Sequence, residues 1–158
     1  MEKKQKNIFI SHIHEDDSKL GELKGLLKKN GIDARDYSIN SDKPNQAKSE
    51  EYIKSQILAP QIQQCSVLVV YISKDTKDSK YVNWEIKYAH DLGKRIVGVW
   101  ENGEKGCELP EALEDLSDAL VGWHGSNIVD AILSNNSIQE NPDGSVRGKR
   151  NIIRHPCG

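Results

Sequence analysis

The sequence has few cysteines, no long hydrophobic run and almost no excess of either charge. Its three cysteines, Cys65, Cys107 and Cys157, have no CxxC spacing, which argues against a disulfide framework or a structural zinc site. No window reaches transmembrane length, and the apolar run near the N-terminus is too short for a signal peptide. The net charge is −2, and no long stretch is dominated by one sign, so non-specific nucleic-acid binding is not indicated. We therefore expect reduced thiols and a soluble cytoplasmic protein that binds neither membrane nor nucleic acid.

Glycine is missing from the loop that follows the first predicted strand. This loop reads SHIHEDD from Ser11 to Asp17, so it supports neither a dinucleotide-binding fingerprint nor a P-loop. His12 and His14 stand beside acidic residues, but no third group of ligands occurs at a matching strand end, so we predict no metal site. The loop is better interpreted as the polar rim of a pocket.

The aspartate of a phosphoacceptor site is also missing. Asp16 and Asp17 resemble the acidic pocket of a receiver domain, but the third predicted strand is followed by Ser73, where that fold needs its acceptor aspartate. We therefore exclude a receiver domain.

Apolar runs and amphipathic helical stripes alternate along the chain. This alternation predicts a doubly wound α/β fold, in which a five-stranded, mostly parallel sheet carries helices on both faces. The domain is expected to cover residues 1–134, and residues 135–158 are expected to form a C-terminal tail or an added hairpin. The predicted strands are 7–11, 32–35, 67–72, 95–100 and 119–123; the predicted helices are 17–30, 49–64, 81–92, 110–116 and 126–133, with Ser49 and Ser126 as N-caps and a long functional loop at 36–48.

Glu85 is the candidate catalytic residue. It lies early in a predicted helix that follows the buried strand 67–72, beside the apolar stripe of Val82, Ile86 and Ala89, so we expect it to be partly desolvated. Ligands of open α/β sheets bind beyond the carboxyl ends of the strands, where such a glutamate can face a substrate. The alternative is a solvated helix residue favoured by the helix dipole.

Three segments resemble the TIR family and its bacterial TIR-like branch: IFISHIHEDD (8–17), RDYSI (35–39) and SKYVNWEI (79–86). Ser79 and Glu85 keep the spacing of the family motif S-x-W-C-x-x-E. The sequence departs from the family pattern in Tyr81 and Val82 at the Trp and Cys positions, in His12 where tyrosine is usual, and in the lack of Pro-Gly after Asp36.

The DYSI segment, the long loop after it and VNWEI resemble most closely the TIR-like domain of bacterial antiphage systems of the Thoeris ThsB type. The resemblance covers about residues 7–133 and implies the flavodoxin-like, three-layer TIR fold.

The resemblance also implies a reaction. Catalytic members of the family cleave the bond between nicotinamide and ribose in NAD+, using the glutamate that Glu85 matches, so NAD+ is expected as a substrate and no cofactor is implied. Trp84 could equally pack in the core. The residues expected to line the nucleotide pocket are Ser11, His12, Asp36, Ser38, Tyr81 and Trp84.

The product and partners follow only from the resemblance. TIR-like proteins of Thoeris systems produce a cyclic ADP-ribose variant that activates a separate effector, which implies an NAD+ glycohydrolase or ADP-ribosyl cyclase in antiphage signalling. The sequence does not choose between a linear and a cyclic product, nor does it identify a phage-derived trigger or a homo-oligomer. Two alternatives stay open: a non-catalytic module that assembles through its surface helices and the loop 36–48, and a sensor that binds NAD+ or a cyclic product without turnover.

Overall fold

Within the part of the chain that the structure describes, five parallel strands form one sheet. The computed structural model describes residues 7–35, 58–103, 107–134, 136–142 and 144–146. The strand order is β2-β1-β3-β4-β5, and all neighbouring strands are parallel. The strands are β1 (Asn7–Ser11), β2 (Asp33–Arg35), β3 (Val67–Ile72), β4 (Arg95–Trp100) and β5 (Ala119–Val121); the α-helices are α1 (Leu20–Lys29), α3 (Ala59–Gln64), α4 (Lys80–Asp91), α5 (Glu111–Leu116) and α6 (Gly125–Leu133).

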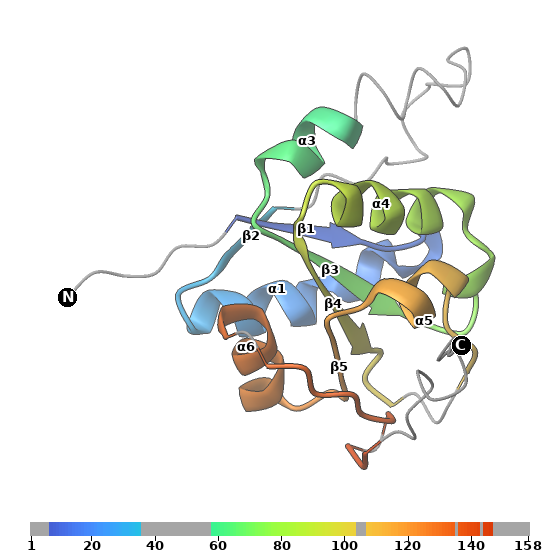
Figure 1. The fold of residues 1–158 in the computed structure, drawn as a ribbon. Helices are drawn as coiled ribbons and strands as arrows, with labels where there is room; N and C mark the ends of the chain where they lie inside the picture. The colour runs from blue at the N-terminus through green and yellow to red at the C-terminus, as the bar shows by residue number, and fades with distance from the viewer. Residues whose placement is uncertain (1–6, 36–57, 104–106, 135, 143, 147–158) are drawn as a thin grey trace.

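Helices cover both faces of the sheet, as Figure 1 shows: α3, α4 and α5 lie on one face, and α1 and α6 lie on the other. The apolar run of β3 explains this arrangement, because successive side chains of a strand point to opposite faces. Leu68, Val70 and Ile72 pack in the cluster beneath α4, whereas Val69 and Tyr71 pack in the cluster against α1. The predicted three-layer, flavodoxin-like α/β fold is confirmed.

Several predicted helix starts differ from the structure, and those at residues 81 and 110 differ by one residue, because α4 begins at Lys80 and α5 at Glu111. The predicted helix 17–30 begins as a 3₁₀ helix, His14–Lys19, and becomes α-helical only at Leu20. The last helix begins at Gly125 with His124 in extended conformation as its N-cap, so the prediction of Ser126 as N-cap is wrong. The predicted loop 36–48 and the N-cap at Ser49 lie outside the described residues.

Strand β5 ends at Val121, two residues earlier than predicted. After β5, the backbone at Gly122 lies close to the backbone of a later segment. A Cβ added at Gly122 would lie 2.8 Å from the carbonyl oxygen of Pro142. Glycine permits this close approach of two backbones.

Residues 136–142 pack beside β5. The amide of Leu120 donates to the Ile138 carbonyl over 2.7 Å, and the amide of Glu140 donates to the Leu120 carbonyl over 2.8 Å. A turn then returns the chain, with an antiparallel bridge between Glu140 and Val146. The boundary between residues 134 and 135 stays a prediction. None of the helices in the described part of the chain has the length and apolar character needed to cross a bilayer.

Candidate functional site

Glu85 and Ser11 meet where strands β1 and β3 end. Ser11 is the last residue of β1, and its hydroxyl donates a hydrogen bond of 2.5 Å to Oε1 of Glu85 in the second turn of α4. Ser11 is fully buried, and Glu85 is 3% exposed. In the strand order 2-1-3-4-5, β1 and β3 flank the point where the order of the strands reverses, which is where open α/β sheets bind ligands. The prediction that Glu85 lies desolvated at a core edge is confirmed.

The first turn of α4 is held by two polar residues. Ser79 is its N-cap, and its hydroxyl accepts a hydrogen bond from the Val82 amide over 3.1 Å. Asn83 donates to the Ser79 carbonyl over 2.9 Å and accepts from the Ala112 amide over 3.0 Å, which ties α4 to the start of α5. Val82, Ile86 and Ala89 are buried against the sheet, as their spacing predicts, and Glu85 lies beside them on the same helix.

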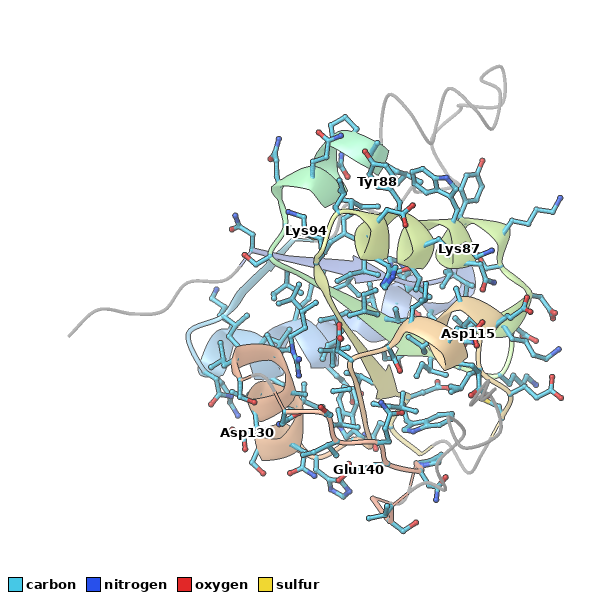
Figure 2. All side chains as sticks on the ribbon, viewed as in Figure 1. Lys87, Tyr88, Lys94, Asp115, Asp130 and Glu140 are labelled. Carbon is cyan, nitrogen blue, oxygen red and sulfur yellow. The ribbon has the colours of Figure 1, made fainter. Side chains whose placement is uncertain are left out.

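His12 follows Ser11 and is 7% exposed, with Nδ1 at 3.3 Å from the Ile10 carbonyl oxygen. Tyr81 and Trp84 are half-buried on α4 and pack against the core cluster beneath that helix. Trp84 also stacks on Tyr88 at 5.0 Å between ring centroids. Figure 2 shows Tyr88 on α4 beside α3, where its hydroxyl accepts a hydrogen bond from Gln63.

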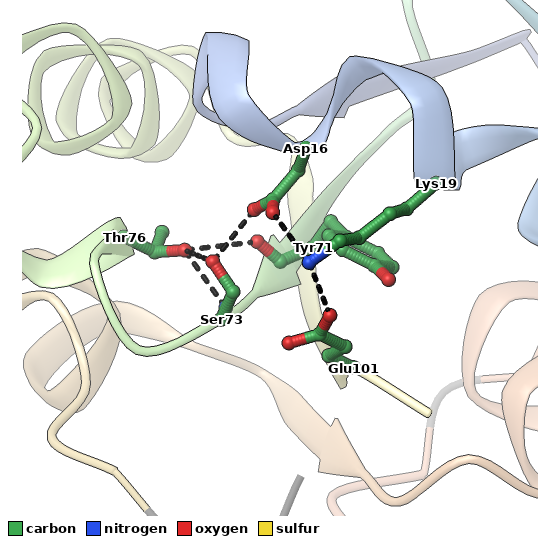
Figure 3. Close-up of polar contacts among 6 residues, drawn as sticks. All are labelled: Asp16, Lys19, Tyr71, Ser73, Thr76 and Glu101. Carbon is green, nitrogen blue, oxygen red and sulfur yellow. Dashed lines mark hydrogen bonds and ion pairs between the residues drawn. The ribbon is translucent and has the colours of Figure 1, made fainter. Parts of the chain in front are cut away.

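A second polar cluster lies at the same edge of the sheet, and Figure 3 shows its contacts. Asp16 comes from the 3₁₀ helix after β1, and its Oδ2 accepts a hydrogen bond of 2.6 Å from the Ser73 hydroxyl, just beyond β3. The Ser73 amide donates to Oγ1 of Thr76 over 2.8 Å. Asp16, Ser73 and Thr76 are all buried. This cluster therefore joins the two segments that leave β1 and β3.

A lysine lies between two carboxylates at this cluster. Lys19 Nζ lies 3.5 Å from Oδ1 of Asp16 and 2.7 Å from Oε2 of Glu101, which follows β4. Burial raises the pKa of the Asp16 carboxyl above its ordinary value, although the Ser73 hydrogen bond and the Lys19 charge act in the opposite direction. The hydrogen bond to Glu101 raises the pKa of Lys19. Asp16 is thus a desolvated carboxyl with two fixed partners.

The structure brings together Ser11 and Glu85 among the predicted site residues, while Asp36 and Ser38 lie outside the residues that it describes. The contact between Asp16 and Ser73 was not predicted. The sequence feature that could have indicated it is the position of both residues after neighbouring strands, since parallel strands end at one edge of a sheet. Within the described ranges, no group of three or more His, Cys, Asp or Glu side chains could hold a metal ion.

Comparison with protein families identifies the family of the chain. The sequence model of the Thoeris protein ThsB, TIR-like domain, matches residues 9–106, which is more than half of the chain. The chain belongs to this family. Both polar clusters of this TIR-like domain lie within the matched residues, whereas β5, α6 and residues 136–146 lie beyond them.

One curated relative and two solved structures are similar to the TIR-like domain. TIR2 of Cytobacillus dafuensis, whose name proposes a cyclic ADP-D-ribose synthase, is 25% identical over 124 residues, covering 77% of this chain and 32% of TIR2. The chain therefore spans about a third of the length of this relative.

Among solved structures, a 2-deoxyribosyltransferase of Bacillus psychrosaccharolyticus has a TM-score of 0.61 at 15% identity, covering 83% of this chain and 98% of that one. A CMP N-glycosidase of Clostridium botulinum has a TM-score of 0.50 at 17% identity, covering 80% of this chain and 97% of that one. At these identities the likeness shows the fold alone.

Proposed function

We propose that this TIR-like domain cleaves the bond between nicotinamide and ribose in NAD+, with Glu85 as the catalytic residue. The observation that carries the proposal is the buried Glu85 carboxylate, bound by Ser11 where β1 and β3 end. Two facts support it: the domain belongs to the ThsB-type TIR-like family, and a relative is named as a cyclic ADP-D-ribose synthase.

A single carboxylate is sufficient for this reaction. Glycosidases that cleave an O-glycosidic bond need a second carboxyl group to protonate the leaving oxygen. Nicotinamide leaves NAD+ from a pyridinium nitrogen, which takes the electron pair of the broken C–N bond and becomes neutral, so no acid is required. The sugar is left with an oxocarbenium-like positive charge. Ionised Glu85, held in a desolvated position, would stabilise that charge as it develops.

The product depends on what captures the sugar. Water would give ADP-ribose, whereas a nucleophilic atom of the same ADP-ribose would give a cyclic product. We propose the cyclic product as a diffusible signal in antiphage defence, which activates a separate effector in the cytoplasm. The name of TIR2 supports the cyclic product, although this chain spans about a third of that protein.

The decisive experiment incubates the purified protein with NAD+ at high protein concentration, with and without lysate of phage-infected cells. Mass spectrometry then measures nicotinamide and every isomer of ADP-ribose. The variants are Glu85→Gln and, as a matched control, Glu22→Gln, which changes an exposed first-turn glutamate of α1 on the opposite face of the sheet. We expect wild type and Glu22→Gln to release nicotinamide with a cyclic isomer, and Glu85→Gln to release none while keeping its fold.

Each other result has a defined meaning. Linear ADP-ribose alone would contradict the signalling role and leave an NAD+ glycohydrolase. An equally active Glu85→Gln variant would overturn the catalytic assignment. Absence of turnover even with infected-cell lysate would favour a non-catalytic assembly module, and lasting thermal stabilisation by NAD+ without turnover would favour a sensor.

A further inference from the structure

Two side-chain hydrogen bonds close a ring through the segments that follow β1 and β3. The first joins Ser11 to Glu85, and the second joins Ser73 to Asp16. Residues 12–15 connect Ser11 to Asp16 along one side, and residues 74–84 connect Ser73 to Glu85 along the other. The position of Glu85 relative to β1 is therefore coupled to the contact between Asp16 and Ser73.

Hydrogen bonds continue from this second contact to the start of α4. The Thr76 amide donates to the Ser73 carbonyl over 3.1 Å, and the Ser79 amide donates to the Thr76 carbonyl over 3.1 Å. The Ser79 hydroxyl then caps α4 at Val82. Each step from Asp16 to the first turn of α4 is thus a directional contact, and Glu85 lies in the next turn of that helix.

The apolar contacts of α4 do not replace this chain of polar contacts. Val82, Ile86 and Ala89 bury the helix against the sheet, but hydrophobic burial is non-directional and tolerates small shifts along the helix. A catalytic group has to be held within about 0.5 Å of its productive position. The hydrogen-bonded path from Asp16 supplies a directional restraint that the apolar face lacks, beside the bond from the Ala112 amide to Asn83 that ties α4 to α5.

A charged contact fixes Asp16 itself. Lys19 bridges Asp16 and Glu101, so the carboxylate is also tied to the chain that leaves β4, as Figure 3 shows. Asp16 is 2% exposed, and a buried carboxylate without partners would carry a large desolvation cost. The arrangement of both partners around Asp16 favours one orientation of its side chain.

We propose that Asp16 and Ser73 are positioning residues, which set the first turn of α4 and thereby the placement of the Glu85 carboxylate against Ser11. The catalytic consequence rests on the proposed function, whereas the structural link does not. Neither residue needs to touch the substrate.

The structural link is tested by amide hydrogen exchange in the full chain. Ser73→Ala removes the donor, and Asp16→Ala removes the acceptor. Both should speed exchange of the Thr76, Ser79 and Val82 amides by about tenfold, which corresponds to about 1.4 kcal/mol, because each variant removes one partner of the hydrogen bond at the start of the path. Ser134→Ala is the matched control, because it removes a hydrogen bond of 2.6 Å to the Asp130 carbonyl at the end of α6. It should leave those three amides unchanged.

The catalytic consequence is tested by steady-state NAD+ consumption. Both alanine variants should lower kcat by about 10- to 100-fold with little change in KM, because displacement of a reacting group by about 1 Å costs up to 100-fold. Asp16→Asn keeps an acceptor oxygen for Ser73 and should recover part of the loss. Replacement of a residue that only stabilised the fold would lower the melting temperature without lowering kcat at nearly constant KM.

The two tests separate the two claims. Unchanged exchange at all three amides in both alanine variants would overturn the proposal, whatever the activity. Faster exchange with unaltered kcat would overturn the positioning role. Faster exchange in a protein whose wild type consumes no NAD+ even with infected-cell lysate would support the structural link and contradict the proposed function instead. If Asp16→Ala does not fold, Ser73→Ala and Asp16→Asn decide the same question.

Discussion

The Ser11 hydroxyl donates a 2.5 Å hydrogen bond to the Glu85 carboxylate, although the two residues are 74 positions apart in the sequence. Ser11 ends β1 and Glu85 lies on α4, so the contact exists only because β1 and β3 are neighbours in the sheet. Burial of a carboxylate is unfavourable unless donors replace its water. Ser11 supplies such a donor from a rigid strand, and it therefore both orients Glu85 and offsets part of its desolvation.

Replacement of Ser11 by alanine tests this pair. Ser11→Ala removes the donor, so we expect kcat for NAD+ cleavage to fall about tenfold, which corresponds to about 1.4 kcal/mol. The free energy of unfolding should fall by about 1–3 kcal/mol, the usual cost of losing a buried hydrogen bond to a charged group. Enzyme kinetics and urea unfolding measure the two effects. Ser11→Thr keeps a hydroxyl and is the control; equal activity of the alanine and wild-type proteins would contradict the role given to Ser11.

The fold was predictable because its signals are local. The run from Val67 to Ile72 is apolar at every position, which is typical of a strand buried on both faces, and that strand is central to the sheet. The end of β5 was less predictable. The sequence 119–123 looks like one strand, but Gly122 contacts the backbone of a segment about twenty positions later, and no local pattern reports such a contact.

The site was predictable only in part. The motif spacing singles out Glu85, and its helical position predicts the burial that the structure has. The contact with Ser11 could not be chosen from the sequence, since the loop after β1 offers several other polar residues, among them His12 and His14. The Asp16–Ser73 contact is not predicted for another reason: the sequence places Asp16 in the polar rim of a pocket, and Ser73 is noted only as a position where a receiver domain needs an aspartate.

The titration of Asp16 should contribute measurably to the pH dependence of the free energy of unfolding. Desolvation raises the pKa of its carboxyl in the folded state above the ordinary value of 3.8, which we take for the unfolded state. At a pH between 3.8 and the folded-state pKa, the folded state therefore binds more protons than the unfolded state. The contribution of Asp16 to stability is therefore present in full below pH 3.8 and is lost as the pH rises through the folded-state pKa. Lys19 and Ser73 limit the shift, and Glu101 adds to it.

The comparison of wild type with Asp16→Asn isolates this effect, because asparagine does not titrate. We expect the free energy of unfolding of the variant to increase relative to that of wild type as the pH rises from below 3.8 through the folded-state pKa, because wild type loses stability over this range and the variant does not. Urea unfolding at a series of pH values measures the difference. A difference that is constant over this range would show that folding does not shift the Asp16 pKa.

Two glycines should respond in opposite directions to alanine. A Cβ at Gly98 in β4 would lie 2.6 Å from Cδ1 of Leu120 and 3.1 Å from Cδ2 of Leu113, so Gly98→Ala should destabilise the protein by about 1–3 kcal/mol through overpacking. Gly25 is exposed inside α1 and has nothing within 4 Å, so Gly25→Ala should stabilise it by about 0.5–1 kcal/mol. Urea unfolding of both variants checks the signs. A neutral Gly98→Ala variant would mean that the ends of the Leu120 and Leu113 side chains move aside at little cost.

Glu140 should stabilise the C-terminal segment without affecting catalysis. Its Oε1 accepts from the Gly122 amide over 3.0 Å, its Oε2 accepts from Nδ2 of Asn127 over 3.1 Å, and its carbonyl accepts from Nε1 of Trp100 over 2.8 Å. Figure 2 shows Glu140 at the sheet edge far from α4. The side chain therefore joins residues 136–146 to the chain after β5 and to α6.

Glu140→Ala would leave the buried Gly122 amide without its acceptor, at a cost of about 1–3 kcal/mol. For a chain of this size each kcal/mol lowers the melting temperature by about 2–4 °C. Glu140→Gln keeps one acceptor oxygen and should lose less. Thermal unfolding measures both changes, and kcat at a temperature where all proteins are folded should equal that of wild type. A large loss of kcat in a folded Glu140→Ala protein would instead mean that the C-terminal segment takes part in positioning the Glu85 site, because the carbonyl of Glu140 also holds Trp100 at the end of β4.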